Sequence, residues 1–255
     1  MHPLHRHTVE FEQRSRAAMA TSVEPLPFGA VVATDDLPDL YDNNLIQIDV
    51  AAPAPVVLET VETVARRLGW RHRNVEVADA AIAEPLAAAF ASADYDTDHL
   101  VTMALLDAPQ DARPHDPLAA TVVDVSAQHL LGRRLAAEQF AVTTERVLDQ
   151  FAERERRLAR VAGARAVVAP RHDPVSRCLL LTDGEILDID AVGTLSVHRG
   201  HGWSTAVMRL AIALAEGRQV VLVADEHDWT MQWYARLGFR VVGRSVQFGR
   251  EPDDG

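Results

Sequence analysis

Cysteine is nearly absent from this sequence, which has one, Cys178, among 255 residues. A single thiol cannot form an internal disulfide, so the chain is not a disulfide-stapled scaffold. No apolar run is long enough to span a bilayer, and the N-terminus has no apolar signal core. These absences predict a cytoplasmic protein with no membrane partner. They also favour a packed strand position for Cys178, inside the apolar run 175–181, over a nucleophilic one.

Basic residues are also in short supply, with 25 Lys and Arg against 37 Asp and Glu and a formal net charge of −12. Such a chain repels the phosphates of nucleic acids, so no nucleic-acid partner is expected and cationic substrates are weakly favoured. The length and the 48% hydrophobic content allow one large or two small domains. Aspartates 94, 96 and 98, on a predicted loop, fit either a cation-attracting site or an acidic soluble surface.

The first half of the chain alternates strand and helix patterns. Apolar periodicity predicts strands at 45–50, 73–77 and 99–106 and helices at 56–68 and 82–90. His2, His5 and His7 have no partner cluster for a metal site, so the N-terminal residues are predicted to be a mobile tail. The predicted domains are a tail or arm at 1–29, an α/β domain at 30–107, a linker rich in proline and aspartate at 108–118, and a second domain at 119–255.

The second half repeats this kind of pattern with more elements. Strands are predicted at 121–125, 164–169, 175–182, 186–194 and 219–224, with an Asp183-Gly184 turn before the fourth of them. Helices are predicted at 128–140, 144–162, 203–214 and 229–237.

The segment Arg199-Gly200-His201-Gly202-Trp203-Ser204 joins a predicted strand to a predicted helix. The first turn of a helix has amide groups without intrahelical acceptors, so a pyrophosphate is stabilised there without a lysine. A Walker loop is excluded because no lysine follows the glycines. The dinucleotide fingerprint fits only its first two glycines, because Thr205 occupies the third place.

Two stretches resemble the GNAT superfamily of N-acetyltransferases. Arg199, Gly202 and Ser204 resemble R-x-x-G-x-[GA], the coenzyme A pyrophosphate loop of that family, with a serine where the family has Gly or Ala. Residues 192–194 stand where the family has its fourth strand, and Ser196 replaces its usual proline. Residues 233–239, Trp-Tyr-Ala-Arg-Leu-Gly-Phe, resemble the second family signature, a tyrosine shortly before Leu-Gly-Phe. The resemblance covers roughly residues 119–250.

The resemblance implies an α/β (α+β) fold with a mixed central sheet of the acyl-CoA N-acyltransferase type, duplicated in tandem. The first half is then a degenerate, coenzyme-free relative, because Pro53 and Pro55 stand at its strand-to-helix join and supply no amide donors. An unrelated α/β cap is the alternative. The resemblance further implies acetyl coenzyme A as cosubstrate and no metal. The residues expected to bind the coenzyme are Val192, Thr194, Arg199, Gly200, His201, Gly202, Trp203 and Ser204.

The resemblance also assigns catalytic roles. Tyr234 takes the place of the general acid that protonates the leaving thiolate, and packing beside Trp233 and Phe239 is the structural alternative. Asp188 stands where some members carry a general base, with Asp190 and Glu185 as weaker candidates. In the competing interpretation a chain of water molecules acts as the base, and these acidic residues are only exposed side chains at the end of a strand. Ser204 has two open interpretations. Its hydroxyl donates a hydrogen bond to a phosphate, or its Cβ atom crowds the loop.

The predicted function is direct transfer of an acetyl group from acetyl coenzyme A to a primary amine of a small molecule, by a monomer or homodimer. One alternative is a catalytically silent acyl-CoA-binding regulatory module. Another is a protein N-acetyltransferase, which would need an open groove for a peptide. No motif in the sequence selects the acceptor.

Overall fold

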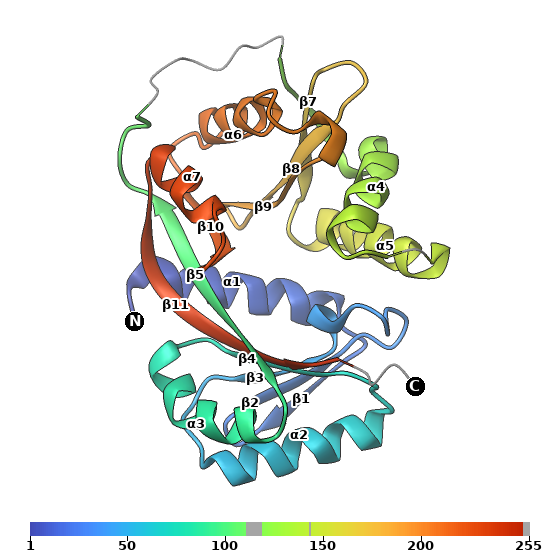
Figure 1. Ribbon diagram of the computed structural model, residues 1–255, viewed down its shortest axis with the longest axis vertical. Coiled ribbons are helices and arrows are strands. Elements are labelled where there is room, and N and C mark those ends of the chain that lie inside the picture. The colour runs from blue at the N-terminus through green and yellow to red at the C-terminus, as the bar shows by residue number, and fades with distance from the viewer. Residues whose placement is uncertain (111–118, 143, 252–255) are drawn as a thin grey trace. The chain divides into compact units, whose positions relative to one another are not determined.

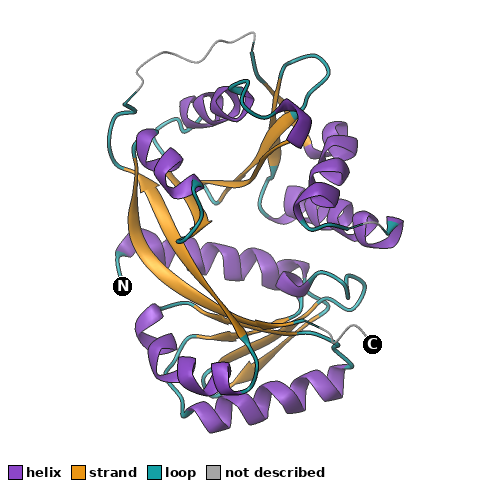
Figure 2. Cartoon of the chain, viewed as in Figure 1, coloured by secondary structure: helices purple, strands orange, loops and turns teal. Residues whose placement is uncertain are grey.

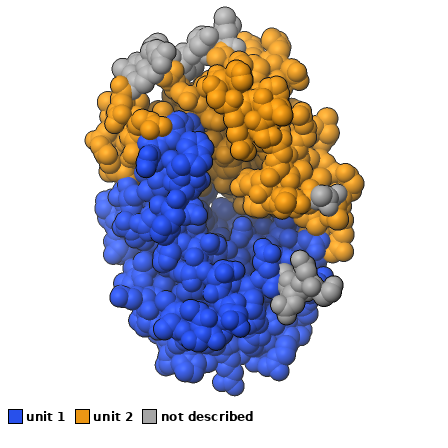
Figure 3. Space-filling view, viewed as in Figure 1, with its two compact units in different colours: residues 1–103, 224–233, 241–255 blue, residues 104–223, 234–240 orange. Residues whose placement is uncertain are grey.

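The computed structural model describes residues 1–110, 119–142 and 144–251 (Figures 1 and 2). The chain divides into two compact units, which Figure 3 shows in different colours. Unit 1 contains residues 1–103, 224–233 and 241–255, and unit 2 contains residues 104–223 and 234–240. The units therefore differ from the predicted sequential domains, because two late segments of the chain belong to unit 1. Among the described residues, no helix has the length and apolar content that crossing a membrane requires.

Unit 1 contains a mixed sheet with the strand order β1-β2-β3-β4-β11-β5. The strands are β1 (Ser22–Leu26), β2 (Gly29–Ala33), β3 (Leu45–Ile48), β4 (Arg73–Val77), β5 (Asp96–Leu105) and β11 (Phe239–Arg250). The helices are α1 (Pro3–Met19), α2 (Ala54–Leu68) and α3 (Ala80–Ser92), with the 3-10 helix η1 (Tyr41–Asn43) before β3. Strands β3 and β4 are parallel, whereas β1–β2, β2–β3 and β4–β11 are antiparallel. Asp96 and Asp98 lie on β5, so their predicted loop location is wrong.

One face of this sheet forms an apolar core with α2 and α3. Its strand residues are Ile46, Ile48, Val75, Val77 and Phe248, and its helix residues include Val57, Val61, Leu86 and Phe90. Phe248 of β11 stacks on Phe90 of α3 with the ring centroids 4.3 Å apart. Arg250, at the end of β11, donates to the Glu62 carboxylate of α2 at 2.6 Å. The last strand of the chain therefore completes the core of unit 1.

Helix α1 replaces the predicted mobile tail. His2 caps the helix by accepting a hydrogen bond from the Leu4 amide at 3.2 Å. The buried His5 ring lies 2.7 Å from the Thr102 hydroxyl through Nδ1 and 3.0 Å from the Ala78 carbonyl through Nε2. The tail prediction is wrong because the buried face of α1 is partly polar, so the sequence carries little apolar periodicity there.

Unit 2 has the strand order β10-β9-β8-β7-β6. These strands are β6 (Thr121–Asp124), β7 (Arg165–Ala169), β8 (Ser176–Thr182), β9 (Ile186–Thr194) and β10 (Gln219–Asp225). The helices are α4 (His129–Gln139), α5 (Glu145–Val161), α6 (Trp203–Ala213) and α7 (Thr230–Arg236), with 3-10 helices η2 (Val125–Gln128) and η3 (Ser196–His198). Only residues 230–233 of α7 and the last two residues of β10 fall in unit 1. Strands β9 and β10 are parallel, and the pairs β6–β7, β7–β8 and β8–β9 are antiparallel.

The elements of unit 2 begin and end within a few residues of their predicted positions, and β9 matches residues 186–194 as predicted. Cys178 lies on β8 and is fully buried, which confirms the packed position predicted for it. Burial raises the pKa of its thiol far above the ordinary value, so the thiolate needed for nucleophilic attack is disfavoured. Most of the predicted linker, residues 111–118, lies outside the described residues.

Burial lowers the pKa of His5 below its ordinary value, although its hydrogen bond with the Ala78 carbonyl partly offsets this effect. The native state therefore favours the neutral ring. The unfolded chain binds more protons than the native state below about pH 6.5, so stability falls as the pH drops through that value. We expect His5→Gln to reduce this loss of unfolding free energy between about pH 7 and pH 5, measured by urea denaturation. The exposed His172→Gln is the control, and an unchanged pH dependence in His5→Gln would contradict the prediction.

Candidate functional site

Strand β9 separates from β10 after the first three of its nine residues. The parallel pairing of these strands runs from Ile186–Gln219 to Asp188–Val221 and ends there. Pairing of β9 with β8 continues to Thr194, which lies opposite Ser176. The β10-facing edge of residues 189–194 therefore lies outside the β9–β10 ladder, and its backbone groups face a place where an extended ligand can pair.

An irregularity in β9 accompanies this separation. Asp190 lies opposite Leu179 and Gly193 lies opposite Arg177, so two residues of β9, Ala191 and Val192, face one residue of β8. Ala191 has a φ of 51°, in the left-handed region. This is the geometry of a β-bulge, which bends a strand and changes the direction of its edge. The bulge includes Val192, the first of the residues predicted to bind the coenzyme.

The loop after β9 leads into the first turn of α6. Gly200 and Gly202 have φ values of 79° and 82°, a region that favours glycine, and Gly202 is the N-cap of the helix. A Cβ added at either glycine would meet no atom within 4 Å, so the loop surface is open. The hydrogen bonding of the helix begins with the Ala206 amide, which donates to the Gly202 carbonyl at 3.0 Å. The amides of residues 203–205 precede it and have no acceptor within the helix.

Arg199 and His201 fold against the backbone of the loop. The Arg199 Nε donates to the Thr194 carbonyl at 3.2 Å, which ties the start of the loop to the end of β9. The His201 Nδ1 lies 2.9 Å from the Arg199 carbonyl. Both side chains are exposed, so the loop carries an arginine charge at its surface.

Three hydroxyl groups connect β8, β9 and α6. Thr194 Oγ1 donates to Ser176 Oγ at 2.8 Å and lies 2.5 Å from Ser204 Oγ. Ser176 Oγ in turn donates to the Gly193 carbonyl at 2.9 Å. The structure therefore gives the Ser204 hydroxyl a partner inside the protein, which the sequence did not predict.

The two carboxylates considered as general bases have different surroundings. Asp188 is 5% exposed and lies between its strand neighbours Leu181 and Val221. Asp190 is more exposed; its Oδ1 accepts from the Ala191 amide at 2.6 Å, and its Oδ2 lies 3.9 Å from the Arg154 guanidinium. Asp190 therefore takes part in the bulge, whereas Asp188 lies at the last paired position before β9 and β10 separate.

Tyr234 lies on α7 and is 7% exposed. Its ring packs edge-on against Phe239, with the centroids 6.1 Å apart and the planes at 65°. Gly238, between them, has a φ of 99°, and its carbonyl accepts from the amides of Leu106 and Asp107. A Cβ at Gly238 would lie 2.2 Å from the Asp107 carbonyl oxygen, so only glycine fits. The Leu-Gly-Phe part of the signature therefore has a packing role.

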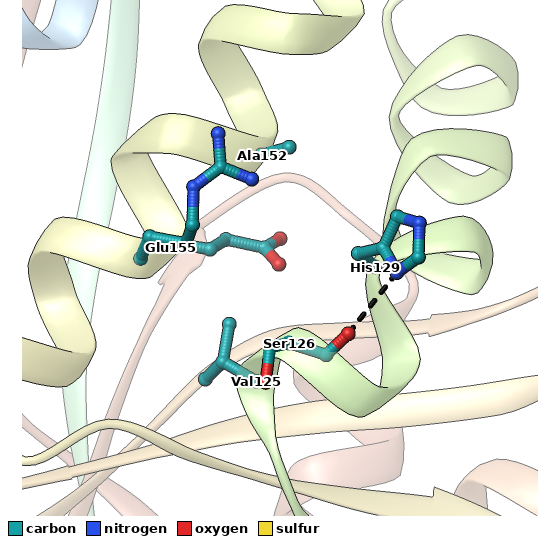
Figure 4. A pocket seen from close by; sticks show the side chains of 6 residues that line it. Val125, Ser126, His129, Ala152 and Glu155 are labelled. Atoms are coloured by element: carbon teal, nitrogen blue, oxygen red, sulfur yellow. Dashed lines mark hydrogen bonds between the residues drawn. The ribbon is translucent and has the colours of Figure 1, made fainter.

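A cavity of about 180 Å³ lies elsewhere in unit 2, between η2, α4 and α5 (Figure 4). It is lined by Val125, Ser126, His129, Ala152, Glu155 and Arg156. In Figure 4 the Glu155 side chain points toward the side that His129 and Ser126 form. This cavity could not be predicted from the sequence, because its walls come from three elements with ordinary surface patterns.

The Glu155 carboxylate is held by a buried polar network. Arg177 of β8 binds it with both terminal nitrogens, one of them at 2.9 Å, and Gln128 Nε2 donates to it at 3.1 Å. Arg177 also donates to Gln128 Oε1 at 2.7 Å. A Cβ at Gly132 of α4 would lie 2.6 Å from the Arg177 guanidinium, so this glycine leaves room for the ion pair. The network fixes α5 and η2 to β8, the strand that pairs with the bulged part of β9.

The structure thus brings together part of the predicted coenzyme site. Thr194, Arg199 and Ser204 are joined by hydrogen bonds, and the loop glycines and Trp203 lie between the last two of them in the chain. The role of Ser176 could not be predicted from the sequence, because its pairing with Thr194 depends on the register of two strands. The bulge at Ala191 could not be predicted either, because no residue type marks it.

No model of a known protein family matches the sequence, and no curated protein sequence matches it. Solved structures are similar in fold. A functionally unknown conserved protein from Staphylococcus epidermidis is 15% identical, with a TM-score of 0.70 over 91% of this chain and 94% of that one. A GCN5-related N-acetyltransferase from Kribbella flavida is 19% identical, with a TM-score of 0.61 over 100% and 97% of the two chains.

A tandem GNAT protein from the clavulanic acid biosynthesis pathway is 16% identical, with a TM-score of 0.55 over 89% of this chain and 80% of that one. The similarities to the Kribbella flavida protein and to the tandem GNAT protein extend over all or most of this chain. They confirm the predicted fold, a mixed α/β architecture of the GNAT type in a tandem arrangement.

The buried network predicts a specific pattern of stability changes. Arg177→Met leaves the Glu155 carboxylate buried without its main partner, and we expect a loss of about 3–5 kcal/mol in unfolding free energy. The double variant Arg177→Met, Glu155→Leu removes both charges and is expected to recover at least about 2 kcal/mol of that loss, measured by chemical denaturation. A loss of unfolding free energy in the double variant equal to the sum of the losses in Arg177→Met and in Glu155→Leu would contradict a coupled ion pair.

Proposed function

We propose that this protein transfers an acetyl group from acetyl coenzyme A to a primary amine of a small molecule, with unit 2 holding the coenzyme. The observation that carries the proposal is the juxtaposition of two sets of backbone groups. They are the separated edge of β9 at residues 189–194 and the first-turn amides of α6. The fold shared with an N-acetyltransferase supports the same assignment.

The diphosphate end of the coenzyme suits the loop at residues 199–204. Amides 203–205 point out of the helix start, and the helix dipole adds positive potential, an interaction worth about 0.3–1 kcal/mol per charge at an exposed site. The two glycines keep side chains away from the loop surface. Arg199 places a positive charge beside it. The pantetheine arm, which carries amides, matches the backbone edge of residues 192–194.

The chemistry requires a proton acceptor for the amine and a proton donor for the sulfur. Bound acetyl coenzyme A would supply the acetyl thioester. We assign the acceptor role to Asp188, because it is a buried carboxylate at the point where β9 and β10 separate. We assign the donor role to Tyr234, because a phenol with an ordinary pKa of about 10 can protonate a thiolate whose conjugate acid has a pKa of about 8.5 at modest cost.

Unit 1 is proposed to hold no coenzyme. Its parallel strands β3 and β4 stay paired up to Ile48 and Val77, the last residue of each strand. Helix α2 has Pro53 as its N-cap and Pro55 in its first turn, so two of the amides that an anion would need are replaced by proline nitrogens.

A cationic acceptor agrees with the charge of the chain. The net charge is −12. Within unit 1, burial and the nearby carboxylates of Asp225, Asp96 and Asp42 raise the pKa of Asp98. A carboxyl group in this environment is stabilised by a nearby cation, since a positive charge offsets the repulsion among the acids.

The proposal is tested by thiol release from acetyl coenzyme A in the presence of a panel of small primary amines. Wild type is expected to release coenzyme A with at least one amine. Tyr234→Phe is expected to lower the rate by about 10²–10⁴-fold, the usual contribution of a general acid. Tyr41→Phe, a change of the same chemistry in η1 of unit 1, is the matched control and is expected to keep the wild-type rate.

Other outcomes separate the alternatives. Binding of acetyl coenzyme A without thiol release from any amine would overturn catalysis in favour of a regulatory binding module. Transfer to peptide N-termini but to no small amine would indicate a protein N-acetyltransferase. Equal rates for Tyr234→Phe and wild type would remove Tyr234 from the chemistry.

A further inference from the structure

We infer that Ser176, Thr194 and Ser204 are positioning residues that fix the diphosphate-binding turn of α6 relative to the thioester-binding edge of β9. This inference rests on the proposed function, because it concerns the same coenzyme site. It adds a residue, Ser176, that neither the sequence motifs nor the proposed chemistry includes. It also explains why a serine stands at residue 204.

The direction of the hydroxyl chain follows from proton counting. A carbonyl oxygen only accepts, so the bond between Ser176 and the Gly193 carbonyl uses the Ser176 proton. Ser176 must then accept from Thr194, which uses the Thr194 proton. The remaining bond, between Thr194 and Ser204, is therefore donated by Ser204. The chain of donors runs in one direction, from α6 through β9 to β8 and back to the Gly193 carbonyl.

This direction settles what Ser204 offers to a ligand. Its only hydroxyl proton is directed inward to Thr194, so the oxygen turns a lone pair toward its surroundings. A phosphate is itself an acceptor, and it gains nothing from a second acceptor. Ser204 therefore contributes to anion binding through its backbone amide and acts on the loop through its attachment to Thr194.

Thr194 is the centre of this arrangement. Its side chain joins β8 and α6, and its carbonyl accepts the Arg199 Nε hydrogen bond. Ser176 and Thr194 are both buried, so the hydrogen bond between them is made in a low-dielectric interior where leaving a group unpaired is costly. Four bonds thus hold the end of β9, the start of the loop and the first turn of α6 in one geometry.

A ligand that binds both the first turn of α6 and the edge of β9 depends on this geometry. A ligand that binds only the first turn of α6 does not. Coenzyme A carries both the diphosphate and the pantetheine arm, whereas 3′-phosphoadenosine 5′-diphosphate lacks the arm. We expect Thr194→Val, which keeps the shape and removes the hydroxyl, to weaken coenzyme A binding about tenfold, equivalent to about 1.4 kcal/mol. The same change should alter the affinity for 3′-phosphoadenosine 5′-diphosphate less than about twofold, both measured by titration calorimetry.

Two further variants control the test. Thr194→Ser restores the hydroxyl and should return coenzyme A affinity to within about twofold of wild type. Ser204→Ala removes one end of the chain at a partly exposed helix position, and it should also weaken coenzyme A selectively. Because this variant leaves the strand residues intact, it decides the question if Thr194→Val fails to fold.

Wild-type affinity for coenzyme A in both Thr194→Val and Ser204→Ala would overturn the inference. Equal weakening of both probes would do the same, because it would indicate general damage to the loop rather than lost alignment. A wild-type protein that binds neither probe would instead overturn the proposed function.

Discussion

Two sets of backbone N–H groups in unit 2, close together in the chain, have no partner within their own element, and such groups are available to a ligand. Residues 203–205 have such groups because they begin a helix, and residues 189–194 have an edge that the β9–β10 pairing does not reach. These two sets of groups lie on either side of one short loop. An extended ligand with a diphosphate at one end and amides at the other satisfies both.

The surrounding contacts serve to hold that backbone in place. The bulge at Ala191 turns the edge of β9, and the hydroxyls of Ser176, Thr194 and Ser204 tie the strand to the helix. On the other side of β8, the ion pair of Arg177 and Glu155 fixes α5. These side chains act through hydrogen bonds and an ion pair that join neighbouring elements. The proposed chemistry therefore depends on alignment of the backbone more than on a cluster of reactive side chains.

The elements around the site could be predicted from the sequence, since β9, the loop glycines and α6 each carry a local signal. The Asp183-Gly184 turn before an apolar-rich run marks residues 186–194, and a repeated apolar stripe marks α6. What the sequence could not predict depends on contacts between distant residues. The buried face of α1 includes His5, Thr8 and Ser15, which gives no apolar periodicity. Strand β11 completes the core of unit 1 although it ends the chain.

The most direct test of the account is hydrogen exchange of the backbone amides with and without coenzyme A. Slower exchange at residues 192–194 and 203–205, with little change at the Glu155 cavity, is the predicted result. Unchanged exchange at these amides, or protection confined to the cavity between α4 and α5, would contradict the assignment of this backbone as the coenzyme site.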